Sequence, residues 1–159
     1  MAVDSATGRV FVANYGDNTV TALEDGGRHV LTTLPIGSGP RAVCVDPAGH
    51  RVYVANHNDA TISVLDAVAL RTVATVPVGA RPTGLAVDPS SHRLYVSHEA
   101  DGGGPERGRV TIIDGATATV LATQSVGNDP AGIALDPDAH RVYVASYAGN
   151  AVAFLQDQP

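Results

Sequence analysis

A seven-residue phrase recurs along this chain and constrains its fold more than any other feature. It occurs as HRVYVAN at 50–56, HRLYVSH at 92–98 and HRVYVAS at 140–146, with a weaker copy, GRVFVAN, at 8–14. The aromatic residue of each copy, at positions 11, 53, 95 and 143, recurs after 42, 42 and 48 residues. The six extra residues of the last interval lie in the glycine-rich segment 100–109. A period near 42 predicts equivalent units that stack or surround an axis.

Each repeat contains four short segments that are typical of β-strands. In the second repeat they are RAVCVD at 41–46, RVYVAN at 51–56, TISVLD at 61–66 and LRTVATVPVG at 70–79, separated by turn signals. No segment shows a sustained helical period. The sequence therefore predicts an all-β chain, a β-propeller built of four-stranded antiparallel blades. We expect a single domain over 1–159, with blades at about 1–36, 37–78, 79–126 and 127–159.

The ends of the repeat pattern leave the propeller incomplete. The fourth blade stops after NAVAFLQ at 150–156 and lacks an outer strand, and Met1 already aligns inside an inner strand. Three alternatives follow: a fragment or misassigned start of a larger propeller, half of an eight-blade ring made by two chains, or a closed four-blade ring. Four blades splay at right angles and need large side chains between them, yet Trp is absent and Phe occurs twice. We therefore expect self-association or missing blades, because unpaired edges and apolar faces remain.

Composition excludes several classes of partner. The chain has 159 residues, 44% of them hydrophobic, which is enough for a globular core. Its formal net charge of −6 argues against a nucleic-acid surface, and no apolar run is long enough for membrane insertion. Cys44 is the single cysteine, so no intrachain disulfide can form. It aligns with alanines in the other repeats and is expected to be a small core residue.

The recurring aromatic residues are expected to fill the space between blades, at Phe11, Tyr53, Tyr95 and Tyr143. The repeat also resembles the YVTN family of β-propeller repeats, on the elements YVAN, TISVLD, VATVPVG, the GxxP turn and AVDP. The resemblance covers essentially the whole chain and implies the fold strongly. It implies function weakly, because the family includes surface proteins, binding proteins and propeller domains of enzymes. It also implies the cell envelope or secretion, although MAVDSATGRV lacks the features of a signal peptide.

Propeller topology places the loops on two faces, and only one of them varies between repeats. On that face lie the GxxP turns and the loops after each second strand. Binding residues tend to lie on variable loops of a rigid frame, so a ligand site is predicted there. The expected ligand is a small anion held by Arg41 and Arg81, or a protein partner. The candidate residues are Asn14, Arg41, Asn56, His57, Arg81, His98, Glu99 and Asp129.

The opposite face repeats nearly unchanged as DPAGHR, DPSSHR and DPDAHR. Asp46, Asp88 and Asp136 are expected to accept hydrogen bonds from backbone amides of their turns. The three histidines at 50, 92 and 140 come from separate blades and should point outward, so they are interpreted as turn residues and not as metal ligands.

No motif of catalysis is present: there is no Gly-x-Ser-x-Gly elbow, phosphate-binding loop or Cys-x-x-Cys pair. His57, His98 and Glu99 have suitable side chains for a metal or acid–base cluster but lack a fixed spacing. We predict no catalytic residue, no cofactor and no metal. The favoured function is a non-catalytic binding or scaffold propeller. The alternative is an enzymatic propeller domain, either a lactonase-like hydrolase or one associated with a redox cofactor.

Overall fold

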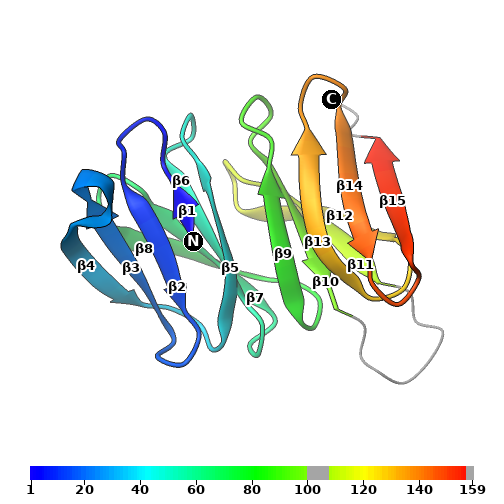
Figure 1. The fold of residues 1–159 in the computed structure, drawn as a ribbon, viewed down its shortest axis with the longest axis horizontal. Helices are drawn as coiled ribbons and strands as arrows, with labels where there is room; N and C mark the ends of the chain where they lie inside the picture. Colours follow the sequence, from blue (N-terminus) through cyan, green and yellow to red (C-terminus); the bar gives the residue numbers. More distant parts are fainter. Residues whose placement is uncertain (100–107, 157–159) are drawn as a thin grey trace.

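The computed structural model describes residues 1–99 and 108–156 and contains four antiparallel sheets that follow one another in chain order (Figure 1). We number the sheets as blades 1–4. Blade 1 contains β1 (Ala2–Val3), β2 (Val10–Asn14), β3 (Thr19–Glu24) and β4 (His29–Pro35), with a short 3-10 helix, η1 (Asp25–Gly27), between the last two. Blade 2 contains β5 (Pro40–Asp46), β6 (Arg51–Asn56), β7 (Thr61–Asp66) and β8 (Arg71–Pro77).

The third and fourth sheets repeat this order. Blade 3 contains β9 (Pro82–Val87), β10 (Arg93–His98), β11 (Arg109–Asp114) and β12 (Thr119–Ser125). Blade 4 contains β13 (Pro130–Asp136), β14 (Arg141–Ser146) and β15 (Ala151–Gln156), so its sheet has three strands among the described residues. The predictions of an all-β propeller and of a fourth blade without an outer strand are confirmed. The predicted glycine-rich loop at 100–109 falls mostly on 100–107, outside the described residues.

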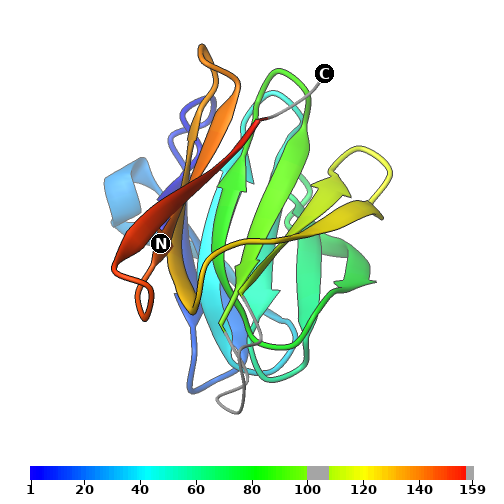
Figure 2. The same ribbon diagram turned by 90° about the vertical axis from the view of Figure 1, so that its right-hand side faces the viewer.

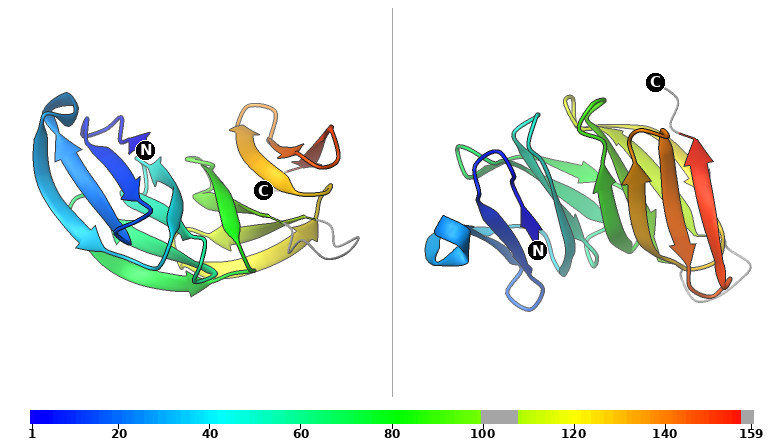
Figure 3. Two further views of the ribbon diagram at one scale, coloured as in Figure 1. Left: turned by 60° about the horizontal axis from the view of Figure 1, so that its bottom comes forward. Right: turned by 45° about the horizontal axis from the view of Figure 1, so that its top comes forward.

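The four blades form an open arc, with the first strand of each blade on the concave side and the outer strands β4, β8 and β12 on the convex side (Figure 3). Blades 1 and 4 lie at the two ends of the arc. In the part of the chain that the structure describes, no helix is long and apolar enough to cross a membrane.

The core consists of three apolar clusters, one between each pair of neighbouring blades. Every blade presents a forward face, toward the next blade in the chain, and a rear face, toward the previous one. The aromatic residues lie on forward faces together with aliphatic residues, whereas the buried residues of the rear faces are all aliphatic. Tyr53, for example, packs with Leu94, Val96 and Ile113 of blade 3. Blades 1 and 2 meet in the same way at Phe11, and blades 3 and 4 at Tyr95.

One expectation for the core is wrong. Phe11, Tyr53 and Tyr95 are at most 1% exposed, as predicted, but Tyr143 at the equivalent position of blade 4 is 36% exposed. Tyr143 holds the position that faces forward in blades 1–3, and among the described residues no further blade follows blade 4 on that side (Figure 2). The side chain that fills an interface in blades 1–3 therefore meets solvent in blade 4.

Cys44 lies on β5 beside the Tyr53 cluster, as expected of a small core residue. Burial raises the pKa of its thiol far above the ordinary value, and the neighbouring Asp46 carboxylate adds to the effect. The thiol is therefore protonated at neutral pH and is a poor nucleophile.

Candidate functional site

The turn that enters each blade lies beside the loop that follows the second strand, along the lower edge of Figure 1. In blades 2–4 the same backbone hydrogen bond joins them, from the residue after the second strand to the residue before the entering proline. The pairs are His57 to Gly39 (2.9 Å), Glu99 to Arg81 (3.0 Å) and Tyr147 to Asp129 (2.9 Å). We call this edge the rim: residues 37–41, 79–83 and 127–131 with 14–18, 56–60, 98–99 and 146–150. It includes all eight candidate ligand residues.

Arg41 and Glu99 meet at the rim and join two blades. Arg41 follows the proline that opens β5, and Glu99 follows β10 of the next blade. Arg41 Nη1 donates to Glu99 Oε2 at 2.7 Å, with the two side chains 45% and 33% exposed. A pair this exposed contributes at most about 1 kcal/mol to stability. Its chemical significance is greater, because it places a cation and a carboxylate side by side at the concave edge.

Asn14 and Asn56 bind their own blades. Each ends a second strand, and its side-chain amide donates to two hydroxyls of the third strand. Asn14 Nδ2 contacts the Oγ1 atoms of Thr19 and Thr21 at 3.0 and 2.8 Å. Asn56 makes the same contacts at 3.0 and 2.8 Å, to Thr61 Oγ1 and Ser63 Oγ. The structure thus gives these two candidate residues a role in fixing the hairpin between the second and third strands.

His98 occupies the same position in blade 3 and is 3% exposed. Its Nδ1 lies 3.0 Å from the Ala80 carbonyl, which can only accept, so Nδ1 carries the proton. Its Nε2 then accepts from the Thr111 hydroxyl at 2.9 Å. Burial lowers the pKa of His98 below its ordinary value of 6.5, and Arg109 lowers it further against a backbone bond that raises it. The neutral imidazole therefore links the GxxP turn to β11 through hydrogen bonds.

This burial makes a pH effect testable. When the pH falls below 6.5, the unfolded chain binds a proton at His98 before the folded chain does, so the free energy of unfolding declines until the lower folded pKa is passed. We expect His98→Gln to reduce that decline in urea melts at neutral pH and at about pH 5. His50→Gln, in an exposed turn, is the control and should keep the parent's decline. An identical pH dependence for parent and His98→Gln would show that His98 is not the group responsible.

The other candidate residues occupy further positions along the rim. His57 follows β6, and its buried Nδ1 has no hydrogen-bond partner among the described residues. Arg81 and Asp129 precede Pro82 and Pro130 with left-handed backbone angles, at φ 51° and 53°. Within the described residues, no three His, Cys, Asp or Glu side chains gather as metal ligands. Among the candidate residues, Arg41 and Glu99 form an ion pair that joins two blades.

The opposite face holds the repeated aspartate turns, and the predicted bonds are confirmed. Asp46 Oδ1 accepts from the Gly49 amide at 3.0 Å. Asp88 and Asp136 do the same with the Ser90 and Ala139 amides, at 2.9 and 3.0 Å. These carboxylates close the hairpin between the first and second strands of each blade.

Sequence reasoning missed one contact on this face. His92 Nδ1 lies 2.6 Å from Oδ2 of the fully buried Asp46, so it joins blade 3 to blade 2. In blades 1 and 3 the hydroxyls of Thr7 and Ser91 occupy the same carboxylate oxygen, at 2.6 and 2.7 Å. Blade 2 has Gly49 at that position, and a Cβ there would collide with the carboxylate. In the sequence, this contact was indicated by the glycine that blade 2 has where blades 1 and 3 have a hydroxyl residue.

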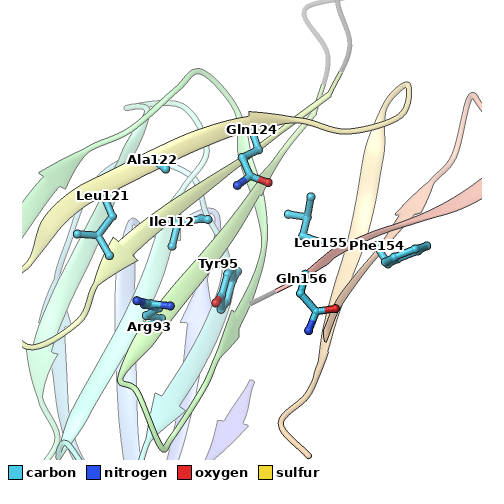
Figure 4. Close-up of a pocket in the computed structure, with 9 residues that line it drawn as sticks. All are labelled: Arg93, Tyr95, Ile112, Leu121, Ala122, Gln124, Phe154, Leu155 and Gln156. Atoms are coloured by element: carbon cyan, nitrogen blue, oxygen red, sulfur yellow. The ribbon is translucent and has the colours of Figure 1, made fainter. Parts of the chain in front are cut away.

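A groove of about 550 Å³ lies between β12 and β15, where blade 4 has no fourth strand among the described residues (Figure 4). Figure 4 shows Phe154 and Leu155 on β15 at one side and Leu121 and Ala122 on β12 at the other. Its floor and edges are formed by Arg93, Tyr95, Ile112, Gln124 and Gln156. An apolar trough beside a free strand edge suits an additional strand better than a polar small molecule.

Comparison with solved structures extends the fold assignment. The hydrazine synthase of Kuenenia stuttgartiensis aligns over 98% of this chain and 44% of its own, at 20% identity and a TM-score of 0.86. A functionally unknown protein of Desulfotomaculum acetoxidans aligns over 92% of this chain and 46% of its own, at 11% identity and a TM-score of 0.81. A candidate 6-phosphogluconolactonase of Bacteroides uniformis aligns over 96% and 48%, at 16% identity and a TM-score of 0.79. The chain thus spans about half the length of these propellers.

Sequence comparison gives the family. No curated protein matches this chain. Residues 66–158, more than half of the chain, match the family described as "Lactonase, 7-bladed beta-propeller". The match begins at the last residue of β7 and covers β8, all of blade 3 and all of the described part of blade 4. It agrees with the blades, with the family resemblance of the repeats and with the solved propellers. The chain belongs to the lactonase 7-bladed β-propeller family.

Proposed function

We propose that residues 1–159 form one propeller unit that binds a small polar molecule at the rim, and that the ligand carries a carboxylate together with hydroxyl groups. The observation that carries the proposal is the Arg41–Glu99 pair, which lies at the concave edge and links two blades. The variable residues of the chain gather on this face, whereas the other face repeats one structural turn.

The chemistry of the pair defines the ligand class. The guanidinium of Arg41 has five N–H donors, and the contact to Glu99 uses Nη1. The remaining donors can hold a carboxylate through charge-assisted hydrogen bonds, while Glu99 can accept from neighbouring hydroxyls. A sugar acid offers both groups at adjacent carbon atoms. A purely cationic ligand would match only Glu99, and a purely apolar ligand would match neither member of the pair.

Lactone hydrolysis is the second candidate function, and the family match over residues 66–158 favours it. The Bacteroides uniformis neighbour is likewise named for the hydrolysis of a sugar-acid lactone. In such a reaction, water adds to the ring carbonyl, the ring C–O bond breaks, and the ring oxygen leaves with a proton. Glu99 or His57 would accept the proton of the attacking water. Arg41 would stabilise the negative charge on the carbonyl oxygen.

Binding is tested by calorimetric titration of D-gluconate into the purified protein. We expect Arg41→Ala to weaken binding about tenfold, which corresponds to about 1.4 kcal/mol. Arg71→Ala, on the outer strand β8, is the matched control for loss of one positive charge. His50→Ala tests the opposite face. Equal affinities for parent and Arg41→Ala, or a loss confined to His50→Ala, would place the site elsewhere.

Hydrolysis is tested separately, with glucono-δ-lactone in a pH-stat. We expect the parent to exceed the spontaneous rate and Glu99→Gln, which keeps the size of the side chain, to fall back toward it. Gluconate binding by the same Glu99→Gln protein reports whether its rim is intact. A parent protein that binds gluconate without accelerating hydrolysis would remove the enzymatic candidate and leave the binding function.

A further inference from the structure

The interface between blades 2 and 3 contains a hollow of about 160 Å³ on the face opposite to the rim. Tyr53 of blade 2 lines it together with His92 and Gly115 of blade 3. The Tyr53 hydroxyl is buried and has no hydrogen-bond partner in the part of the chain that the structure describes. A buried hydroxyl without a partner is costly, so this atom indicates that a molecule in the hollow completes the contact.

The neighbouring interface shows that the repeat does not require this hollow. Between blades 1 and 2, Phe11 holds the position of Tyr53, and Ala67 holds the position of Gly115. A ring without a hydroxyl there meets a residue with a Cβ. Blade 2 therefore differs from blade 1 by an added polar group, and blade 3 differs from blade 2 by the loss of the side chain opposite it.

The arginine at this end of blade 2 also leaves the hollow open. In blade 1, Arg9 donates to two backbone carbonyls of the next blade, at 2.6 and 3.2 Å. Arg51 holds the equivalent position in blade 2 but contacts its own blade. Its Nη1 lies 3.3 Å from the His50 carbonyl and 3.6 Å from the Asp66 carboxylate. The charge of Arg51 is therefore paired within blade 2.

Asp46 lines the hollow with a fully buried carboxylate that has unused acceptor capacity. Its Oδ1 accepts from the Gly49 amide at 3.0 Å, and its Oδ2 lies 2.6 Å from His92 Nδ1. Asp88, the equivalent residue of blade 3, accepts from one amide and two hydroxyls of its own turn. A carboxylate has about four lone-pair sites, so Asp46 can accept further hydrogen bonds.

Two more oxygen atoms lie together at the hollow. A Cβ on Gly115 would collide with both the Tyr53 hydroxyl and the His92 carbonyl, so these two oxygens flank one point. The His92 carbonyl accepts from the Gly115 amide at 2.9 Å and keeps a second lone pair. A single donor group near this point can therefore bond to both oxygens.

The charges around the hollow favour a cation. Burial raises the pKa of the Tyr53 hydroxyl, which keeps its proton at neutral pH. The carboxylates of Asp46 and Asp114 add to that effect, and Arg51 opposes it. Because Arg51 is paired with Asp66, the buried carboxylate of Asp46 is the charge that a ligand would meet.

We propose that this hollow binds an ammonium group, either the free ion or the primary amine of another molecule. The N–H donors of such a group match the Asp46 carboxylate, the Tyr53 hydroxyl and the His92 carbonyl, and its charge offsets the buried carboxylate. The chain contains no lysine, so none of its own side chains supplies the group. The site is separate from the rim and does not depend on the function proposed there.

Titration of ammonium chloride at neutral pH, followed by NMR spectra that resolve each backbone amide, tests the site. We expect saturable shifts at Gly49 and Gly115, with a dissociation constant in the millimolar range. Tyr53→Phe should weaken binding about tenfold by removing one acceptor. Tyr95→Phe removes the same hydroxyl at the next interface and is the matched control, with unchanged binding. Gly49→Ser restores the hydroxyl residue of blades 1 and 3 and should abolish binding by occupying the Asp46 carboxylate.

Two further salts define the ligand. Potassium chloride supplies a cation of similar size without N–H donors and should give no saturable shift at these amides. Methylammonium chloride distinguishes the sources: binding of both ammonium salts means that the hollow admits a primary amine, whereas binding of ammonium alone means that it takes the free ion. An absent response to ammonium, an equal response to potassium, or unchanged binding by Tyr53→Phe would overturn the proposal.

Discussion

Tyr53→Ala and Tyr95→Ala are each expected to lower the free energy of unfolding by about 3–5 kcal/mol, the usual cost of truncating a buried large aromatic side chain. Both rings are at most 1% exposed and lie between blades, where few neighbouring atoms can move to fill the space. Urea melts followed by circular dichroism measure the change.

Tyr143→Ala is the matched control, because it removes the same ring from the same position of a blade without a forward neighbour. With 36% of Tyr143 exposed, the expected loss is at most about half that of the buried pair. Equal losses at all three positions would mean that blade 4 is covered as blades 2 and 3 are. Losses below about 1 kcal/mol at Tyr53 and Tyr95 would mean that these rings point away from the interface between the blades.

Gly115→Ala is the substitution with the second largest expected effect, a loss of about 1–3 kcal/mol through overpacking. A Cβ on Gly115 would collide with the Tyr53 hydroxyl and with the His92 carbonyl. The hydroxyl lies beside a hollow of about 160 Å³ and has no hydrogen-bond partner among the described residues. It therefore contributes little to stability itself, but it prevents any side chain at position 115.

The chain contains its own reference for this site. Between blades 1 and 2 the equivalent pair is Phe11 and Ala67, an aromatic ring without a hydroxyl beside a residue with a Cβ. We expect Tyr53→Phe to rescue the part of the Gly115→Ala loss that comes from the ring hydroxyl, while the part that comes from the His92 carbonyl remains. Urea melts of the parent, both single variants and the double variant form the cycle. Strictly additive losses would show that the ring hydroxyl of Tyr53 and the Cβ at position 115 do not compete for the same space.

The repeat period predicted the architecture because each strand contributes a short apolar segment at a fixed step, and the structure keeps that step in all four blades. The phase of the second strand followed from the recurring aromatic residue, and Phe11, Tyr53 and Tyr95 are buried accordingly. Tyr143 differs because burial depends on a neighbour, and residue identity alone does not report whether a neighbouring blade is present.

The candidate site was predictable to the level of the face and not to the level of contacts. The rim follows from topology, since the entering turn and the loop after the second strand must end at the same edge. The Arg41–Glu99 pair spans 58 residues and joins residues at non-equivalent positions of their repeats, so the period gives no indication of it. Asn56 and His98 bind within their own blades because hydroxyl residues of the third strand lie opposite them, a register that becomes clear only when the strands are paired.

The four blades of one chain form an open arc, and a distance between its two ends tests that arrangement most directly. Spin labels at Ser5 and Asp138 report on the hairpins between the first and second strands of blades 1 and 4, in a Cys44→Ala protein diluted with unlabelled chain. Labels at Ser90 and Asp138, in the neighbouring blades 3 and 4, provide the reference. The open arc predicts a clearly longer separation for Ser5–Asp138 than for Ser90–Asp138. Similar separations for the two pairs would mean that blade 1 packs against blade 4 in a closed four-blade ring, which would contradict the account.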